Sequence, residues 1–577
     1  MQWQVRPKAP ESFFKQFPEY SSLIVQLLYN RGLKTQQQID EFFNPDYQSD
    51  LHDPFLLKGM GKAVKRILQA IARQEKVVIY GDFDADGVCS MAILFLALRE
   101  LGLPSPEAYI PDRSKEGHGL NEKAVSELAR KGAKLIITVD CASRDLKEVA
   151  LAKSLGLEII ITDHHETGEE LPEAAAFINP WQKGDKYPFK GLAGAGVAYK
   201  LASALIEKSN PLKLDSLKKW LLDLTAIATV ADVMPIIGEN RTLVKYGLKV
   251  LAQTKWLGLR ELMKAAQSGA PLTDLDTYTL GYVLGPRLNA AGRINRANAA
   301  FRLLITQDKQ EAEKLAQQLN QENSTRQNLT EKVVRDVRNR LEKKMPQGSG
   351  PKLIFEGSPD YPVGIIGLAA GKIAEKYCRP TIIYREEEGM IDASCRTIPQ
   401  FNLIEAVEQC APFLDSFGGH KDAAGFSFKK IKLNKVREIF SQIAEEKLRG
   451  KDLSPLLNVD LELSLEDINW SNYDQIQNFA PFGRDNPEPR FLARDLEISD
   501  LRMVGNNGKH LKMELMMFSN QSNRGKTFKA IAFNFGEWRE KLEKGDSIDI
   551  VFELLADEWD GYKNLQLKII DLRPKNL

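Results

Sequence analysis

Cysteine is scarce in this sequence. Only five of the 577 residues are cysteines, and no two of them have the C-x-x-C spacing of zinc ribbons and redox motifs. A disulfide framework or a cysteine-based zinc site needs more cysteines at closer spacing. The sequence therefore excludes both and favours a reducing compartment.

Long apolar runs are also missing. No run approaches the roughly 20 apolar residues that a membrane-spanning helix needs. The first 20 residues, MQWQVRPKAPESFFKQFPEY, contain no apolar core of a secretory signal. We therefore expect a cytoplasmic protein that does not enter a membrane.

An excess of charge of one sign is absent as well. The formal net charge is +1 for 79 basic and 78 acidic residues, so any nucleic-acid surface must be a local patch. The chain is too long for one hydrophobic core, and two to four domains are expected. We find no internal repeat and no low-complexity tract.

Helical and strand patterns alternate from about residue 61. The apolar strands KVVIYG, KLIITVD and LEIIITDHH are each preceded by an amphipathic helical pattern. Repeated units of this kind, with strands apolar throughout, predict a parallel sheet covered on both faces. Short strands spaced by turns follow after about residue 455, which is typical of a small β-barrel.

These patterns predict an α/β protein with several parts. The stretch from 306 to 345 reads as one long helix or a helical pair, because it keeps apolar residues at helical spacing without Gly or Pro. The expected order is an N-terminal segment (1–50), a catalytic parallel-sheet domain (51–305), a connecting helix (306–348), a smaller α/β domain (349–450) and an OB-like β-barrel (455–577).

Acidic and histidine side chains follow three predicted strands and one helical stretch. In open α/β sheets, sites form outside the carboxyl ends of the strands, so we expect these side chains to converge. They are Asp82, Asp84 and Asp86 in DFDADG, Asp140 in TVD, Asp163, His164 and His165 in TDHH, and Asp232 in ATVAD.

Such a cluster predicts bound cations. A single aspartate at a strand end is most often a turn residue or a helix N-cap. Two unit charges about 4 Å apart, however, repel by roughly 4 kcal/mol at an effective dielectric near 20. Carboxylates favour Mg²⁺ or Mn²⁺, and imidazoles tilt the choice toward Mn²⁺. Two such ions about 3.5–4 Å apart would clamp a phosphoryl oxygen and activate a water, which predicts phosphoester or phosphoanhydride hydrolysis.

The motifs DFDADG, TVD, TDHH and ATVADVMP resemble, in order and spacing, the four motifs of the DHH phosphoesterase superfamily. Further stretches, LGPRLNAAGR, FGGHKDAAGF and NFAPFGRDNPEPRF, are similar to its bacterial branch of exonucleases that degrade single-stranded DNA 5′→3′. The similarity covers nearly the whole chain from about residue 50. It implies mononucleotide products, a role in DNA recombination and repair, and work alongside a single-strand-binding protein and a helicase. We expect a monomer.

The resemblance also implies roles for individual residues. It assigns Asp84, Asp86, Asp140, His164 and Asp232 as metal ligands. Asp82, His165 and His420 are expected to be catalytic, with Asp82 a ligand or the group that orients one, and His165 a proton donor or a support for a ligand. The 5′ phosphate and the strand are assigned to Arg113, Arg287, Arg293, Ser394, Arg396, Gly418 and Gly419.

Three positions depart from the pattern of the superfamily. Phe83 stands where a tyrosine is usual, and His118 in EGHGL also replaces a usual tyrosine. After Asp140 the usual Asn-Gly is replaced by Cys141 and Ala142, so the turn is expected to adopt positive φ less readily.

The barrel sequence interleaves Lys509, Lys512, Lys526 and Lys529 with Phe518 and Phe528. A basic groove with stacking aromatics would hold single strands without reading their sequence, although half-buried strands alternate in the same way. Two other functions stay open. One is a phosphodiesterase of short oligoribonucleotides or cyclic dinucleotides, and the other is an inactive single-strand-binding scaffold.

Overall fold

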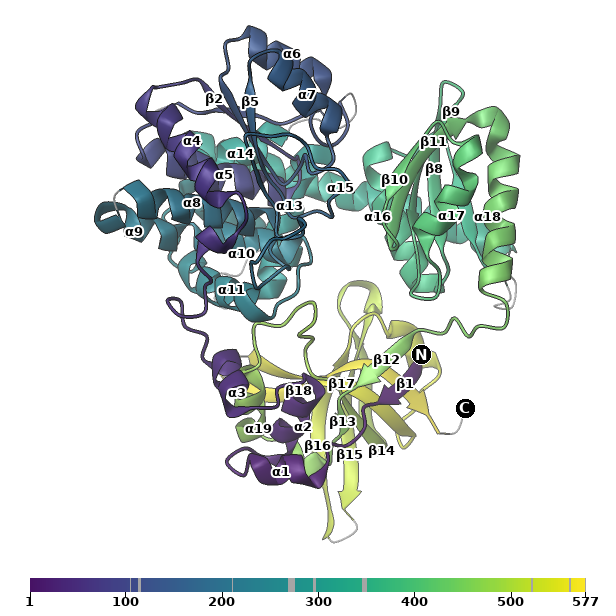
Figure 1. Cartoon of the computed structure of the whole chain (residues 1–577). Helices are drawn as coiled ribbons and strands as arrows, with labels where there is room; N and C mark the ends of the chain where they lie inside the picture. Colours follow the sequence, from purple (N-terminus) through teal and green to yellow (C-terminus); the bar gives the residue numbers. More distant parts are fainter. Residues whose placement is uncertain are drawn as a thin grey trace. The chain divides into compact units, whose positions relative to one another are not determined.

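The computed structural model describes the chain except residues 104, 113–115, 210, 268–274, 294–296, 345–349, 520–521, 560–561 and 576–577. The chain divides into two compact units (Figure 1). One comprises Met1–Leu51, Pro235–Thr242 and Pro455–Leu577, and the other comprises His52–Met234 and Leu243–Ser454. No helix among the described residues is long and apolar enough to cross a membrane.

The first sheet is parallel and has the order β3-β2-β4-β5-β6. In register, Gly81 pairs with Val139 and Val139 pairs with Thr162, so the three central strands end at the same edge. All residues of β2 and β4 are buried, as their apolar sequences require. The strands are β2 (Val77–Gly81), β3 (Glu107–Tyr109), β4 (Leu135–Val139), β5 (Glu158–Thr162) and β6 (Ala176–Ile178).

Helices cover both faces of this sheet (Figure 1). On one face, α6 (Glu122–Arg130) and α7 (Leu146–Ser154) pack on Tyr80 and Ile136. On the other lie α4 (Met60–Ala72), α5 (Ala85–Glu100) and α8 (Gly194–Ser209). The domain continues with α9 (Pro211–Trp220), α10 (Leu222–Ala231), α11 (Gly238–Leu251), α12 (Leu257–Ala266), the π-helix η2 (Thr279–Leu284), α13 (Gly285–Arg293) and α14 (Ala297–Ile305).

One uninterrupted helix, α15 (Lys309–Lys344), leads to the second α/β domain. It packs on α12, α13 and α14, and its later residues Val333 and Val337 share a core with α16 (Val363–Tyr377). The second sheet has the order β10-β11-β9-β8-β7, in which only β7 and β8 are parallel. Its other elements are β7 (Ile354–Gly357), β8 (Thr381–Glu387), β9 (Met390–Arg396), α17 (Leu403–Cys410), β10 (Ser416–Gly419), β11 (Ala423–Lys429) and α18 (Leu433–Lys447).

The C-terminal domain is a closed barrel, because β14 pairs with β15 on one side and with β17 on the other. Its strands are β14 (Phe491–Val504), β15 (His510–Ser519), β16 (Ser522–Ala532), β17 (Ser547–Trp559) and β18 (Tyr562–Pro574). With the parallel sheet, the long helix and the second α/β domain, the barrel confirms the predicted fold class.

The N-terminal segment, for which the sequence predicts no role, packs onto the barrel. Strand β1 (Gln2–Val5) pairs in parallel with β12 (Leu456–Val459). Phe13, Leu27 and Phe42 share one core with Phe491 and other barrel residues. These side chains come from α1 (Glu11–Gln16), α2 (Ser22–Asn30) and α3 (Gln36–Phe43).

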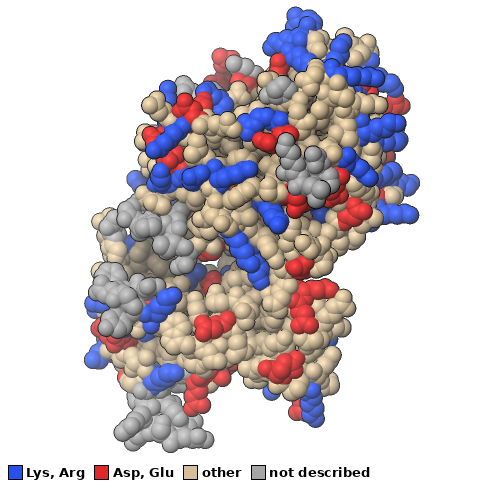
Figure 2. All heavy atoms as spheres, turned by 90° about the vertical axis from the view of Figure 1, so that its left-hand side faces the viewer, with Lys and Arg blue, Asp and Glu red and all other residues tan. Residues whose placement is uncertain are grey.

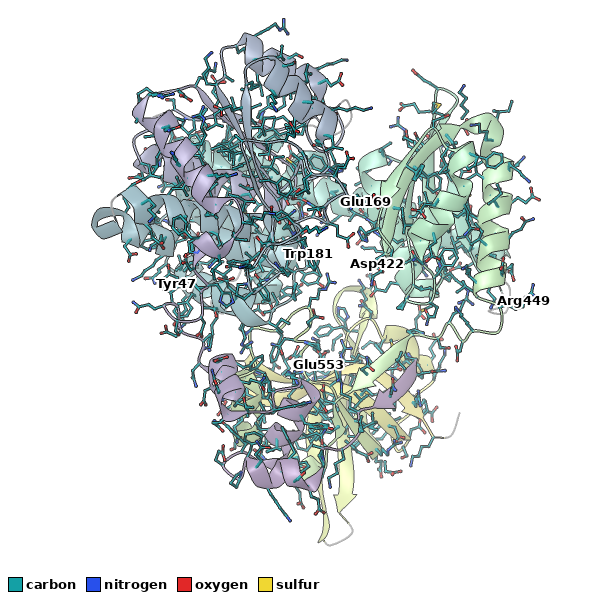
Figure 3. The ribbon with its side chains drawn as sticks, viewed as in Figure 1. Tyr47, Glu169, Trp181, Asp422, Arg449 and Glu553 are labelled. Carbon is teal, nitrogen blue, oxygen red and sulfur yellow. The ribbon has the colours of Figure 1, made fainter. Side chains whose placement is uncertain are left out.

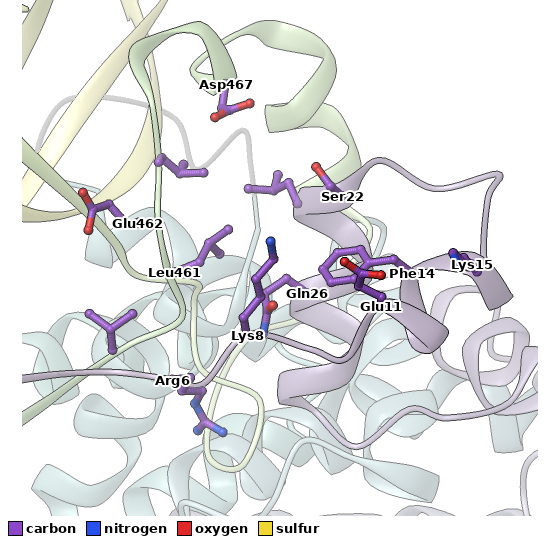
Figure 4. Close-up of a pocket in the computed structure, with 13 residues that line it drawn as sticks. Arg6, Lys8, Glu11, Phe14, Lys15, Ser22, Gln26, Leu461, Glu462 and Asp467 are labelled. Carbon is purple, nitrogen blue, oxygen red and sulfur yellow. The ribbon is translucent and has the colours of Figure 1, made fainter.

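A pocket of about 640 Å³ lies where this segment meets β13 (Leu461–Glu462) (Figure 4). Phe14 and Leu461 line it together with charged side chains of both signs, among them Lys8 and Glu462. None of the site residues predicted from the sequence lines it. Charges of both signs are also interspersed on the face drawn in Figure 2, in keeping with the small net charge.

Candidate metal centre

The aspartates of DFDADG lie in the tight connection from β2 to α5. Asp84 caps the helix, since its Oδ1 accepts hydrogen bonds from the backbone N–H groups of Asp86 (2.9 Å) and Gly87 (3.0 Å). A Cβ on Gly87 would lie 2.5 Å from the Asp82 carbonyl oxygen, so only glycine fits there. The connection thereby buries Asp82 and Asp86 at the edge of the sheet.

Asp140 and His164 reach the same edge from β4 and β5. The His164 Nε2 lies 3.1 Å from Asp140 Oδ1 and 3.6 Å from both Asp86 Oδ2 and Asp232 Oδ2. Asp232 is the residue that ends α10. Four chain segments thus bring carboxylates and an imidazole together, which is the convergence expected at the carboxyl ends of parallel strands.

The side chains fall into overlapping groups whose ligand atoms lie within 4.8 Å of one another. One group is Asp82, Asp84 and Asp140, and a second is Asp86, His164 and Asp232. A third joins Asp140, His164 and His165, so it shares Asp140 with the first group and His164 with the second. Asp82 Oδ1, Asp140 Oδ1 and His164 Nε2 are buried with no hydrogen-bond partner. Oxygen-rich sets with one imidazole and unsatisfied buried atoms fit two hard divalent cations that share Asp140.

The electrostatics agree with this fit. Burial, and next the charges of Asp82 and Asp86, raise the pKa of Asp84 to about 6. Burial, and next the charge of Asp86, raise the pKa of Asp140 well above its ordinary value. Without a cation, the site therefore disfavours its own ionised carboxylates.

The start of α8 holds Asp86 in place. The backbone N–H groups of Gly194 and Ala195 donate to the two Asp86 carboxylate oxygens at 2.8 and 2.7 Å. A Cβ on Gly194 would lie 2.6 Å from Asp140 Oδ1. Sequence reasoning missed this support, although the run GLAGAG before a predicted helix is the signal that could have found it.

Asp163 organises the two histidines. Its Oδ1 accepts from the His164 and His165 backbone N–H groups at 2.7 and 3.2 Å, and lies 2.8 Å from His165 Nδ1. Burial alone would raise the pKa of Asp163, but the hydrogen bond and charge of His165 lower it below its ordinary value. Burial would likewise lower the pKa of His165, yet Asp163 raises it to about 9. His165 is more exposed than His164 and lies 3.9 Å from Asp140 Oδ1.

His118, whose role the sequence left open, contacts the cluster. Its Nδ1 lies 3.3 Å from Asp82 Oδ2, and its ring centroid lies 4.6 Å from that of Phe83. The segment that contains His118 is held in place by the Tyr80 hydroxyl, which donates to the carbonyl of the next residue, Gly119, at 2.9 Å.

The turn after Asp140 adopts positive φ even though it lacks glycine. Ala142 has φ 81° and Asp140 has φ 60°. Without glycine this conformation is less readily adopted, as the sequence indicates, so it carries a conformational cost. The ordered contacts around it, among them the Asp140 N–H to the Thr162 carbonyl at 3.0 Å, hold the conformation despite its cost.

A second set of predicted residues lies in the second α/β domain. Ser394, Arg396 and Gly418 line a pocket of about 380 Å³ beside the start of α16. A Cβ on Gly367 of α16 would lie 2.8 Å from the Ser394 hydroxyl. The pocket therefore has room, backbone access and one arginine, which suit an anion.

Gly419 ends β10, and His420 begins the turn to β11; this turn also contains Asp422, which is labelled in Figure 3. Gly419 has φ 142°, and a Cβ there would lie 2.4 Å from the Ala423 carbonyl oxygen. His420 is exposed and its backbone N–H donates to that same carbonyl at 2.8 Å.

Of the three arginines predicted in the first domain, the structure describes the side chain of Arg287 alone. Arg287 lies on α13, where its Nε donates to Asn320 Oδ1 at 3.0 Å and a terminal N–H donates to the Val283 carbonyl. Arg113 lies outside the described residues, and so does the side chain of Arg293.

The prediction that Phe528 of the barrel stacks on bases is wrong. This ring is buried in the barrel core and is unavailable for stacking on bases. Lys526 donates to the Ile468 carbonyl at 3.1 Å, while Lys509 and Lys529 are exposed. The side chain of Phe518 lies outside the described residues. Strand alternation, the other interpretation of this pattern, accounts for Phe528.

Three family models match the chain. They are the DHH family, N-terminal domain (residues 76–229), the DHHA1 domain (350–446) and the RecJ OB domain (459–571). The first covers the metal-centre residues from Asp82 to His165, and the second covers the Ser394 pocket.

Whole-chain relatives agree with these matches. The single-stranded-DNA-specific exonuclease RecJ of Bacillus subtilis is 39% identical over 99% of this chain and 70% of its own length. That of Haemophilus influenzae is 32% identical over 96% of both chains. The crystal structure of Thermus thermophilus RecJ in complex with Mn²⁺ has a TM-score of 0.82 at 27% identity, covering 99% of this chain and 79% of that one. The chain therefore belongs to the RecJ family.

Proposed function

We propose that this protein is a metal-dependent exonuclease that degrades single-stranded DNA 5′→3′ to 5′-mononucleotides in recombination and repair. The observation that carries the proposal is the pair of ligand groups joined by Asp140, with buried oxygen and nitrogen atoms that lack partners. In a RecJ family member, a site of this chemistry suits hydrolysis of a phosphodiester. RecJ of Thermus thermophilus has been crystallised with Mn²⁺ and with Mg²⁺, which supports the same choice of ions here.

We assign the ligands as two sets. Asp82, Asp84 and Asp140 hold one ion, and Asp86, His164 and Asp232 hold the other. Asp140, whose Oδ1 lies 3.1 Å from His164 Nε2, is assigned as the carboxylate that the two ions share. Asp82, expected to be catalytic, is thus placed among the ligands. When bound, two divalent cations supply an activated water and neutralise charge that develops on the phosphate.

His165 and Asp163 act together in this proposal. In the metal-free protein burial would lower the pKa of His165, but the hydrogen bond with Asp163 raises it to about 9, which favours the protonated imidazole at neutral pH. A protonated imidazole beside the metal centre is suited to donate to the oxygen that leaves the phosphate. Asp163 fixes the orientation of that ring.

The 5′ end is assigned to the second α/β domain and to arginines of the first. Ser394, Arg396, Gly418 and Gly419 would bind the terminal phosphate, because an arginine fork and close backbone approach suit a dianion. Arg287 adds a further positive charge, and the assignments of Arg113 and Arg293 rest on the family pattern alone. His420 would contact the strand near the bond that is cut.

The chain is expected to act as a monomer in the cytoplasm, on single strands supplied by a helicase and covered by a single-strand-binding protein. The exposed lysines of the barrel, Lys509 and Lys529, are suited to the DNA backbone, without a stacking role for Phe528.

The test is digestion of a 5′-phosphorylated single strand with Mn²⁺ or Mg²⁺. A strand with a blocked 5′ end, a duplex and a cyclic dinucleotide are digested in parallel, and Asp140→Ala serves as the metal-site control. Mononucleotides from the open single strand alone, lost in the variant, are the expected result. Turnover of the dinucleotide alone would show that the protein is a phosphodiesterase of cyclic dinucleotides instead. Tight strand binding without turnover would indicate an inactive scaffold.

A further inference from the structure

Helix α13 lies directly against the metal-binding motif. The Asn289 side-chain oxygen accepts a hydrogen bond from the Ala85 backbone N–H at 2.7 Å. A Cβ on Gly292 would lie 2.6 Å from the Phe83 carbonyl oxygen, which shows how closely the two segments pack. A charged side chain on α13 is therefore held at a fixed place relative to the aspartates.

Arg287 is such a side chain, and it has no acidic partner. It is partly buried, and its printed hydrogen bonds go to the neutral oxygens of Asn320 and Val283. Asn320 belongs to α15, so this bond also ties the two helices together. An arginine that meets no carboxylate within the described part of the chain keeps its full positive charge for a ligand.

Arg326, six residues after Asn320 on α15, is the electrostatic neighbour of Arg287. Burial, and next the charge of Arg287, lower the pKa of Arg326. Its Nε is buried and has no hydrogen-bond partner, and it forms no ion pair among the described residues. Two partly buried arginines on contacting helices repel each other, and an anion between them would relieve that repulsion.

The surroundings of Arg326 contain a further unsatisfied polar group. Asn323, one helical turn earlier, is 2% exposed, and its Oδ1 has no partner. A side-chain amide can offer its donor or its acceptor after a half-turn, so it can contact a phosphate or a water bound to one. Glu322, the acid nearest in sequence, accepts from Gln318 through Oε1 at 2.9 Å, while its Oε2 is buried without a hydrogen-bond partner, and it forms no ion pair with Arg326.

We propose that Arg326 is a phosphate-binding residue that, together with Arg287, holds one backbone or terminal phosphate of the single strand where α13 meets α15. The inference deepens the proposed function and rests on it. Two guanidinium groups present planar forks of N–H donors that match phosphate oxygens, and a phosphate between them removes their repulsion. The strand is thereby held at α13 and α15, in addition to the pocket of Ser394 and Arg396.

The test compares strand binding by the full-length protein and by Arg326→Gln. Affinity for a fluorescent single strand is measured by anisotropy in EDTA, which prevents digestion, over a range of salt concentrations. Loss of one phosphate contact should weaken binding about tenfold, and the slope of log K against log salt should become shallower by about 0.7. Arg302→Gln is the matched control, because Arg302 is exposed and already paired with Glu311.

A structural role would give a different result. If Arg326 only supports packing, Arg326→Gln lowers the melting temperature while the salt slope stays at the wild-type value, and the proposal is overturned. Arg326→Lys keeps one charge and replaces Arg326→Gln if the latter does not fold. It should keep the wild-type salt slope but bind more weakly because it lacks the fork, whereas wild-type affinity for this variant would exclude the bidentate contact. Failure of the wild-type protein to bind single strands at all would instead contradict the proposed function.

Discussion

Two regions of this molecule bury charge in opposite ways. At the metal centre, buried carboxylates and His164 leave oxygen and nitrogen atoms without partners. In the barrel unit, the fully buried guanidinium of Arg241 donates five hydrogen bonds, all to backbone carbonyls, including those of Phe42 and Phe479 at 2.7 and 2.9 Å. Its guanidinium carbon also lies 3.8 Å from the Phe42 ring centroid.

Whether the buried charged groups have hydrogen-bond partners distinguishes a ligand-binding site from a structural contact. The five backbone carbonyls satisfy the N–H donors of Arg241, although burial, and next the charge of Arg31, lower its pKa to about 9. At the metal centre the compensation is only partial: Asp84 and Asp86 accept backbone N–H groups, but Asp82 Oδ1 and Asp140 Oδ1 have no partner, so the fold keeps the cluster at the cost of stability. Buried charge alone does not indicate function, whereas buried charge without partners does.

The largest expected effect comes from removing the shared carboxylate. Asp140→Asn should lower nuclease activity by about 10³-fold or more, because an essential charge-stabilising element is lost. The same change should raise the unfolding free energy in EDTA by about 1 kcal/mol or more, since repulsion with Asp86 is relieved. Activity assays and urea unfolding of one preparation measure both. A variant that is both inactive and less stable would contradict the comparison.

Removing Arg241 from its five carbonyl acceptors should have the opposite effect on stability. Arg241→Met should lower the unfolding free energy by about 3–5 kcal/mol, because five carbonyl groups lose their donor. Chemical unfolding followed by tryptophan fluorescence measures it. Arg241→Lys is the control that keeps the charge without the fork, and it should recover only part of the loss. Full stability of Arg241→Met would show that the hydrogen bonds of Arg241 do not hold the N-terminal segment on the barrel.

The stability of the metal-free protein should depend on pH through the raised pKa values of the aspartates. The pKa of Asp84 is raised to about 6 and that of Asp140 is also raised, so the folded state binds these protons more tightly than the unfolded chain. Their contribution to stability therefore increases as pH falls from about 7 toward 4, and decreases as pH rises through the same window.

Saturating Mn²⁺ should reverse that sign, because the ligands must then be deprotonated. Thermal unfolding at several pH values, in EDTA and in Mn²⁺, measures the reversal. The difference between wild type and Asp140→Asn isolates the aspartates from the remaining titrating groups. The same pH slope with and without Mn²⁺ would mean that the ions do not bind at these carboxylates.

His118 offers a smaller effect at the edge of the metal centre. It lies beside Asp82 Oδ2, while Oδ1 of the same carboxylate has no partner. Groups that orient a ligand are worth about 10–100-fold in metal affinity. His118→Phe, which retains a ring next to Phe83, should weaken one Mn²⁺ site about tenfold by calorimetry, and His118→Asn should recover part of it. Unchanged affinity in His118→Phe would assign His118 no part in holding Asp82.

Backbone strain near the ligands gives the smallest expected effect. Val233, directly after Asp232, has φ 55°, which is costly for a β-branched residue. Val233→Gly should raise the unfolding free energy by about 1 kcal/mol, whereas Val233→Ala, which keeps a Cβ, should gain less. Equal stability of all three proteins in thermal unfolding would show that no strain is stored at this position.

Much of the metal centre could be predicted from the sequence. Parallel strands end together, so Asp82, Asp140 and His164 had to meet once their strands were identified. The helical spacing from 306 to 345 predicted one long helix or a helical pair, and the structure has the single helix α15. These features depend on local patterns that a single sequence contains.

Other features depend on packing between distant segments. The backbone support of Asp86 by α8, the contact of His118 with Asp82 and the docking of the N-terminal segment all join residues far apart in the chain. Phe528 shows the limit of periodicity, because alternation does not tell which face of a barrel strand points inward.

Equilibrium binding of Mn²⁺ to the full-length protein without DNA tests the central claim most directly. We predict two Mn²⁺ ions per chain for the wild type and at most one for Asp140→Asn, since Asp140 belongs to one ligand group and lies 3.1 Å from His164 of the other. No binding at millimolar Mn²⁺, or two ions retained by the variant, would contradict the assignment of this acidic cluster as the metal centre.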